Sequence, residues 1–199
     1  MNILKGNKMK EQFGISDLRE SINKDVIDKL HGAQLCPQLC RTQTEFLRGL
    51  KGVYVSVEHL STEAKKYGLI RQNIQTDTEL RVRQNGIRVL TIDELHKRYQ
   101  AFIEGGFKRM DAAVFYVNVN IGIDEEVGDA AVNINLQVVQ PAFLPRERDI
   151  VFGDATTWQN GYIFLCELNK ITGVRESVKN RVDIFINDYL TANPKQTER

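Results

Sequence analysis

Cysteine is scarce in this chain, and long apolar runs are absent. The 199 residues include three cysteines, an odd number that does not suit a disulfide framework. A helix that spans a bilayer needs about 18 or more consecutive apolar residues, and no segment approaches that length. The basic segment 1–10 is not followed by the apolar core of about 7–15 residues found in a secretory signal. From these absences we expect a cytoplasmic protein without a membrane span.

An excess of one charge sign is lacking too. The sequence has 27 Lys and Arg against 26 Asp and Glu, which gives a net charge of +1 at pH 7. Nucleic-acid binding through bulk charge requires a strongly basic chain or patch. We therefore predict that nucleic acid is not a partner. A hydrophobic content of 42% is ordinary for a globular protein, and the length fits one domain with an N-terminal extension.

Motifs of the common enzyme classes are missing as well. None of the 14 glycines forms the GxGxxG or GxxxxGK[ST] spacing of phosphate-binding loops. The G-x-S-x-G nucleophile elbow is also absent. The three histidines, His31, His59 and His96, lie far apart on different predicted elements. The sequence therefore favours a non-enzymatic protein without a cofactor. The alternative is an enzyme with an unrecognised site that uses Glu58, His59 or the arginines near Arg81.

Two of the cysteines raise a question of metal binding. Cys36 and Cys40 form a CxxxC pair, and His31 is the nearest candidate for a third ligand. A tetrahedral zinc site usually needs a second Cys or His pair, so two free cysteines are the favoured interpretation. A metal-binding protein that uses Cys36 and Cys40 is the alternative. Cys166 lies in the apolar run 162–166, which predicts a small buried core residue.

The strongest structural signal is the segment 114–140, which consists of two arms that alternate apolar and polar residues. The apolar positions are Phe115, Val117, Val119 and Ile121 in the first arm and Val132, Ile134, Leu136 and Val138 in the second. Alternation with a period of two indicates strands, and the charged turn 124–129 between them completes an antiparallel hairpin. Its acidic spacing does not match a calcium loop, so a solvated turn is favoured over a cation site.

The polar positions of these arms would form an amide-rich face. They include Asn118, Asn120, Asn133, Asn135 and Gln137, beside Tyr116. Antiparallel sheets often leave one face in water, so a solvated outer face is the favoured interpretation. The functional alternative is a binding surface for a peptide, a strand or a glycan.

Helices and further strands follow from periodicity and capping signals. Two predicted helices cover residues 16–30 and 71–85. A third begins at Ile92, after a capping box formed by Thr91 and Glu94. A fourth begins at Val174 and ends at Asn193-Pro194. Predicted strands cover 53–57, 87–90 and about 150–168, with Trp158 as a core anchor. The strand, helix, strand order favours parallel pairing of 53–57 with 87–90.

Together these elements predict an α/β fold. We expect a mixed sheet of about five strands, a strand-helix-strand unit followed by antiparallel strands, and helices packed on the sheet, one of them long and C-terminal. The expected organisation is an N-terminal extension with an amphipathic helix (1–48), a single α/β domain (49–195) and a polar tail (196–199). Asp77 and Glu79, next to Arg81 and Arg83, are interpreted as surface pairs within one helix.

Several segments of the region 50–195, taken together and in order, resemble a family of small bacterial proteins that has no assigned activity. They are 50–58 (LKGVYVSVE), 76–87 (TDTELRVRQNGI), 116–120 (YVNVN), 156–158 (TTW) and 185–195 (FINDYLTANPK). The resemblance carries over no catalytic residue. Members of the family usually begin with a signal peptide immediately before the segment that matches Leu50, so the resemblance implies a periplasmic or envelope location as the alternative to the cytoplasm.

These observations favour a non-enzymatic binding or assembly domain. Its partner would be another protein or a second copy of the chain, with a homodimer as the simplest assembly. The hypothesis rests on the missing catalytic motifs, on the amide-rich sheet face and on the additional N-terminal helix.

Overall fold

A computed structural model of the chain describes residues 42–105, 110–143 and 152–194. The chain divides into two compact units, Met1–Arg41 and Thr42–Arg199. The predicted helix 16–30, His31, Cys36 and Cys40 lie outside the described residues. The second unit contains the sheet; its first element is a turn of 3-10 helix, η1 (Gln43–Leu47), which precedes the boundary predicted at residue 49.

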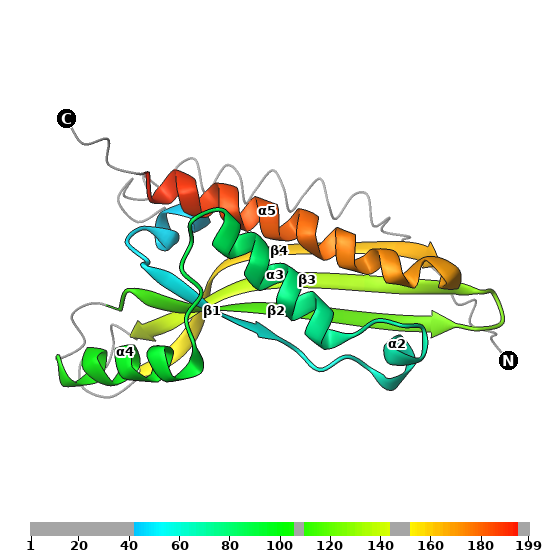
Figure 1. Cartoon of the computed structure of the whole chain (residues 1–199), viewed down its shortest axis with the longest axis horizontal. Helices are drawn as coiled ribbons and strands as arrows, with labels where there is room; N and C mark the ends of the chain where they lie inside the picture. Colours follow the sequence, from blue (N-terminus) through cyan, green and yellow to red (C-terminus); the bar gives the residue numbers. More distant parts are fainter. Residues whose placement is uncertain (1–41, 106–109, 144–151, 195–199) are drawn as a thin grey trace, which may run out of the picture. The chain divides into compact units, whose positions relative to one another are not determined.

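The centre of this unit is a four-stranded mixed sheet with the order β1-β2-β3-β4 (Figure 1). The strands are β1 (Gly52–Val57), β2 (Ala112–Asp124), β3 (Asp129–Phe143) and β4 (Phe152–Glu167). β1 runs parallel to β2, and the other neighbours are antiparallel. The predicted mixed α/β fold is therefore confirmed. The predicted antiparallel hairpin is present, with Val117 opposite Leu136 and Asn118 opposite Asn135.

The prediction of about five strands was wrong, because residues 87–90 form no strand. They make a single parallel bridge, between Val53 and Val89. The Val53 amide donates to Arg88 O at 2.9 Å, and the Leu90 amide donates to Val53 O at 2.8 Å. The capping box at Thr91 then begins the next helix at once, so the ladder cannot extend. The parallel neighbour of β1 is consequently β2.

The helical elements begin and end largely where their capping residues indicate. They are η1, α2 (Thr62–Lys66), α3 (Arg71–Gln84), α4 (Ile92–Glu104), η2 (Leu168–Gly173) and α5 (Val174–Ala192). The predicted capping box is confirmed: the Glu94 amide donates to Thr91 Oγ1, and the Glu94 carboxylate accepts from the Thr91 amide at 2.9 Å. Gly86 follows α3 with φ 79°, a left-handed conformation that glycine adopts without a steric penalty.

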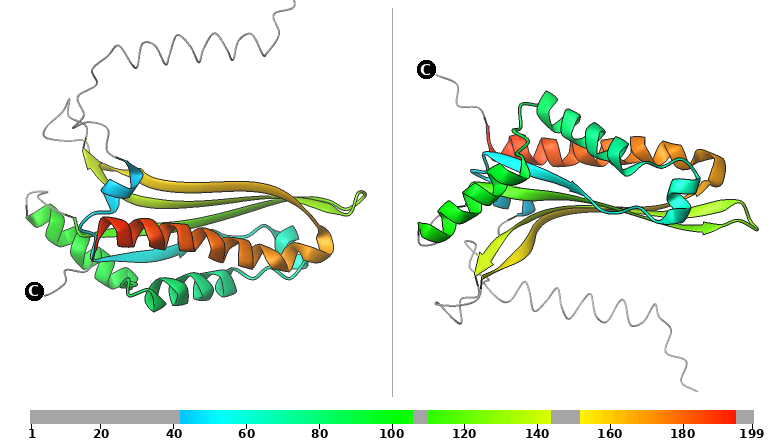
Figure 2. Two further views of the ribbon diagram at one scale, coloured as in Figure 1. Left: turned by 90° about the horizontal axis from the view of Figure 1, so that it is seen from above. Right: turned by 60° about the horizontal axis from the view of Figure 1, so that its bottom comes forward.

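The main core lies between the sheet and the two helices α3 and α5, which cover the same face (Figure 2). Phe185 of α5 stacks on Phe115 of β2, with ring centroids 4.1 Å apart, and meets Trp158 of β4 edge-on at 5.4 Å. Trp158 is 2% exposed, which confirms its predicted core position. Its indole N–H donates to Asp188 Oδ2 at 2.8 Å, so the buried ring keeps a hydrogen-bond partner.

A smaller core lies on the other face of the sheet, at one end. There Leu95 of α4 packs with Leu90 and Ala112, against the partly buried side chains of Tyr54, Met110 and Val114. These contacts cover only the start of β1 and β2. The rest of that face carries no described helix.

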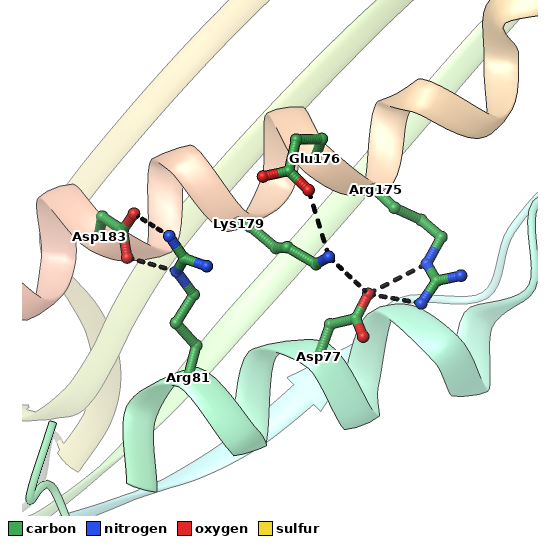
Figure 3. A network of polar contacts seen from close by, with 6 residues as sticks. All are labelled: Asp77, Arg81, Arg175, Glu176, Lys179 and Asp183. Atoms are coloured by element: carbon green, nitrogen blue, oxygen red, sulfur yellow. Dashed lines mark hydrogen bonds and ion pairs between the residues drawn. The ribbon is translucent and has the colours of Figure 1, made fainter. Parts of the chain in front are cut away.

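Ion pairs join α3 to α5 (Figure 3). Arg81 donates twice to Asp183, with both N···O distances 2.5 Å. Arg175 donates twice to Asp77 Oδ2, at 3.0 and 2.7 Å. The interpretation of Asp77 and Arg81 as members of surface pairs within one helix was therefore wrong, because their partners come from α5. Only Arg83 and Glu79 pair at i,i+4, at 2.9 Å.

Removal of residues 1–41 should leave a folded unit, whereas removal of 1–48 should destabilise it. The longer deletion takes away Leu47, which is fully buried, and thereby opens a cavity in the core. It also removes the Leu47 carbonyl that accepts from Asn193 Nδ2 at 2.9 Å. We expect a loss of about 2–5 kcal/mol in the free energy of unfolding, measured by urea denaturation. Equal stability of the two truncated chains would contradict this role of η1.

The Arg81–Asp183 pair should show a measurable coupling energy. A double-mutant cycle with Arg81→Ala and Asp183→Ala should give roughly 0.5–1 kcal/mol at low salt, because the pair is bidentate and its side chains are only 35% and 38% exposed. Salt should reduce that value. The matched control is Glu79→Ala with Arg83→Ala, a pair within one helix for which we expect about 0.3–0.5 kcal/mol. A coupling energy near zero for Arg81 and Asp183 would mean that packing alone joins the helices.

Candidate functional site

The sheet face opposite α3 and α5, here called the open face, carries the predicted amides. Its residues come from three strands and are Tyr116, Asn118, Asn120, Asn133, Asn135, Gln137, Gln159, Ile163 and Leu165. The alternating apolar residues of β2 and β3 are buried on the other side, with Val117 and Leu136 fully inaccessible. The predicted division into a buried and an amide-rich face is thus confirmed. Whether the amides bind anything is a separate question.

A polar cluster surrounds Glu58, which directly follows β1. Its carboxylate accepts a hydrogen bond from Asn118 Nδ2, and Asn120 Nδ2 donates to Asn118 Oδ1 at 2.5 Å. Burial raises the pKa of Tyr116, and its hydrogen bond to Glu58 raises it further, so the phenol stays a neutral donor at pH 7. The Glu58 carboxylate therefore has its hydrogen-bond donors within the cluster. The other polar side chains of the open face are uncharged donors and acceptors.

The outer edge of β1 is closed by other parts of the chain. The three outward carbonyls belong to Val53, Val55 and Val57. They accept from the Leu90 amide at 2.8 Å, from Gln75 Nε2 at 3.0 Å and from Arg71 Nε at 2.6 Å. The three valines are at most 2% exposed. No incoming strand can reach this edge without displacing α3 side chains.

The outer edge of β4 is different. The Gln159 amide donates outward to Gln43 Oε1 at 2.7 Å. Alternate residues of a strand direct their amide and carbonyl groups to the same side, so Gly161, Ile163 and Leu165 also point outward. Within the described ranges, no partner outside the sheet ladder is recorded for their backbone groups. We call the outward side of residues 159–166 the β4 edge.

The β4 edge is uncharged and partly apolar. Residues 159–166 (QNGYIFLC) contain no charged side chain. Ile163 is 72% exposed and Leu165 76%, more than any other large hydrophobic residue in the described part of the chain. The bulge of β4 lies elsewhere, at Thr157, where the register shifts between Val138 and Val139. Natural edge strands are usually protected by charge, proline or bulges, and these eight residues have none of the three.

Beside Leu165, the open face becomes apolar and hollow. A depression of about 350 Å³ is lined by Leu165, by Val127, by the small residues Gly122 and Ala131, and by Asp124 and Asp129 of the hairpin. Val127, in the turn of the hairpin, is 69% exposed. This end of the sheet therefore offers apolar contacts next to the amide-lined centre.

A second hollow of about 350 Å³ contains one carboxylate paired with two cations, which leaves a net charge of +1. Asp111 pairs with Arg98 of α4 and with Lys51 Nζ at 3.2 Å. Burial alone would raise the pKa of Asp111, but the hydrogen bonds and charges of Arg98 and Lys51 outweigh burial and hold that pKa below its usual value. The arrangement ties α4 to the starts of β1 and β2, which is a structural role.

The structure does not assemble the residues proposed for an enzyme. Arg81 is engaged by Asp183 in the helical layer, whereas Glu58 joins the polar cluster of the open face. His59, in the loop after β1, and His96, in α4, are both exposed. Cys166 is a free cysteine that packs against the core as predicted, but it is only partly buried, so the prediction of a buried residue was wrong.

Sequence reasoning missed Ile163 and Leu165 as surface residues. In the run 162–166 all five side chains are apolar or aromatic, so no alternation of polarity revealed which face each residue occupies. One signal was available: this strand is the last in the sequence and follows a hairpin, and such a strand often lies at the edge of a sheet.

Comparison with known proteins adds no relative. The chain matches no protein-family model, no curated protein and no solved structure. Among the described residues, no helix is long and apolar enough to cross a membrane, and no group of three or more His, Cys, Asp or Glu residues is placed to hold a metal ion.

The Asp111 pairs should make stability depend on pH below about 4. Because the pKa of Asp111 is lowered in the folded state, its contribution is complete above the unfolded-state pKa of about 4 and is lost as the pH falls through the folded-state pKa. At pH 7, Asp111→Asn should reduce the free energy of unfolding by roughly 1–3 kcal/mol. That difference should disappear in strong acid.

The control is Asp93→Asn, which removes an equal charge from an exposed position of α4. Denaturation curves at several pH values measure both variants. A deficit of Asp111→Asn that persists unchanged in strong acid would contradict the assignment.

Proposed function

We propose that the unit is a non-enzymatic protein-binding domain that accepts an extended polypeptide as an additional strand on the β4 edge. The observation that carries the proposal is the contrast between the two edges of the sheet. The β1 edge has all three outward carbonyls bonded and its valines buried. The β4 edge offers backbone groups that have no partner among the described residues, beside two exposed apolar side chains.

The chemistry of an added strand matches what the β4 edge presents. Backbone hydrogen bonds supply affinity that is independent of sequence, and alternate side chains of the guest supply specificity. One half of the guest's side chains would lie beside Ile163 and Leu165 on the open face. Neutral amides such as Asn133 and Asn135 lie one strand further in and can bond polar groups of a longer partner.

The site requires neither a cofactor nor a charged ligand. This agrees with the hypothesis from the sequence that nucleic acid is not a partner. We place the domain in the cytoplasm, with the cell envelope as the alternative that the family resemblance implies; strand addition operates in either compartment.

A labelled peptide with the sequence of residues 159–167, carrying Cys166→Ser, should bind the full chain at high dilution. Fluorescence anisotropy measures the affinity, and hydrogen exchange should show protection confined to the β4 edge, with none gained at β1. Ile163→Lys should weaken binding more than about tenfold, because a charge at the centre of an edge opposes pairing. Leu80→Lys, at an exposed position of α3 outside the sheet (52% exposed), should bind normally. Saturable binding without protection of residues 159–167 would contradict the proposal, as would the absence of binding.

A further inference from the structure

We propose that the strand added to the β4 edge is β4 of a second copy, antiparallel, with the twofold axis at Ile163. The inference rests on the proposed function, because it names the partner of the same edge. Two four-stranded sheets would join into one continuous sheet. In this register Ile163 faces Ile163 of the second copy, and Gly161 faces Leu165 of the second copy.

Backbone geometry supports this register. Gly161, Ile163 and Leu165 point their amide and carbonyl groups outward, so each opposed pair can exchange two hydrogen bonds, about six in total. The outward groups of Gln159 are excluded from the count, because its amide already donates to Gln43 Oε1. The ladder therefore uses the free groups and leaves the existing contact with η1 intact.

Side chains on the open face are complementary in size. The two copies of Ile163 would meet at the axis, and Leu165 would lie beside Gly161, which has no side chain to obstruct it. The pairing would thereby cover the two most exposed large hydrophobic residues of the described ranges. In an isolated copy, the side chains of Ile163 and Leu165 are exposed to water. Complete burial of one such side chain would contribute about 1.5–3 kcal/mol to the free energy of association.

Side chains on the other face are complementary in type. Tyr162 would lie opposite Phe164 of the second copy, an aromatic cross-strand pair of the kind that stabilises sheets. Within one copy these rings already stack, with centroids 5.2 Å apart, and the Arg181 guanidinium lies 4.2 Å above Tyr162. Tyr162 is 41% exposed in the single chain, so a further aromatic neighbour can be accommodated.

Charge selects the same register. No residue from 159 to 166 is charged, and the first charge beyond them, Glu167, would lie opposite the neutral Gln159 of the second copy. An axis at Leu165 would place Ile163 against Glu167 and Gly161 against Asn169, which lies beyond the strand. An axis at Gly161 would place Ile163 against Gln159, whose edge is occupied by Gln43. Of the three axes at Gly161, Ile163 and Leu165, the one at Ile163 avoids both conflicts.

Cysteine cross-linking tests the partner and the register together. The experiment uses the full chain with Cys36→Ser, Cys40→Ser and Cys166→Ser as background. Ile163→Cys should form a disulfide-linked dimer on mild oxidation, because a hydrogen-bonded pair has Cα atoms about 5.5 Å apart, within the range of a disulfide. Leu165→Cys alone should not, since the two copies of residue 165 would be about 14 Å apart.

A mixture of two single variants gives the matched control. Gly161→Cys and Leu165→Cys should cross-link with each other but not with themselves. A side chain at Gly161 is tolerated, because its Cβ would meet only Asn135 Oδ1, at 3.8 Å. Light scattering should give a mass near twice 22.8 kDa for the unmodified chain and for Leu80→Lys, and the monomer mass for Ile163→Lys. Circular dichroism verifies that each variant is folded.

The outcomes separate this inference from the proposed function. A monomer at all concentrations that still binds the 159–167 peptide retains strand addition and excludes the second copy as the guest. A dimer that survives Ile163→Lys, or that cross-links at Leu165 with itself, places the interface or the axis elsewhere and overturns the inference. A monomer that does not bind the peptide overturns both.

Discussion

The contact of Phe185 with the sheet is the interaction on which the described fold depends. Its ring stacks on Phe115 and meets Trp158 edge-on, so a single side chain of α5 joins the interior strand β2 to the edge strand β4. All three rings are at most 2% exposed. The contact decides which face of the sheet is buried, and because side chains alternate along a strand, it also decides that the amides face outward.

Aromatic packing and ion pairs contribute free energies of different size to the contact between the helices and the sheet. Each buried aromatic ring removes about 150–250 Å² from water, which at about 25 cal/mol/Å² is several kcal/mol. A partly exposed ion pair between α3 and α5 contributes about 1 kcal/mol or less. The aromatic core therefore supplies the stability of the helix layer. The pairs of Arg81 and Arg175 set the position of α3 along α5, because each guanidinium finds its carboxylate in one alignment only.

Local patterns in the sequence predicted the hairpin, the capping of α4 and the C-terminal helix, since each depends on residues close together in the chain. Three features could not be predicted in this way. Residues 87–90 have strand-like composition, but α4 begins immediately after them. Arg81 finds Asp183 across 102 positions of sequence. Ile163 and Leu165 lie in a uniformly apolar run, which gives no indication of the face or the edge. The site was therefore only half predicted: its amide face was recognised, and its apolar edge was not.

The closed edge of β1 has a consequence for how far assembly can proceed. A sheet with two accessible edges can add copies at both ends, and such growth produces fibres. Here Arg71, Gln75 and the segment around Val89 occupy one edge, so the described sheet has one edge left to accept a strand. When two such molecules join, no pairing edge remains. If copies pair through β4 as proposed, assembly ends at two copies, because the side chains of α3 occupy the other edge of the sheet.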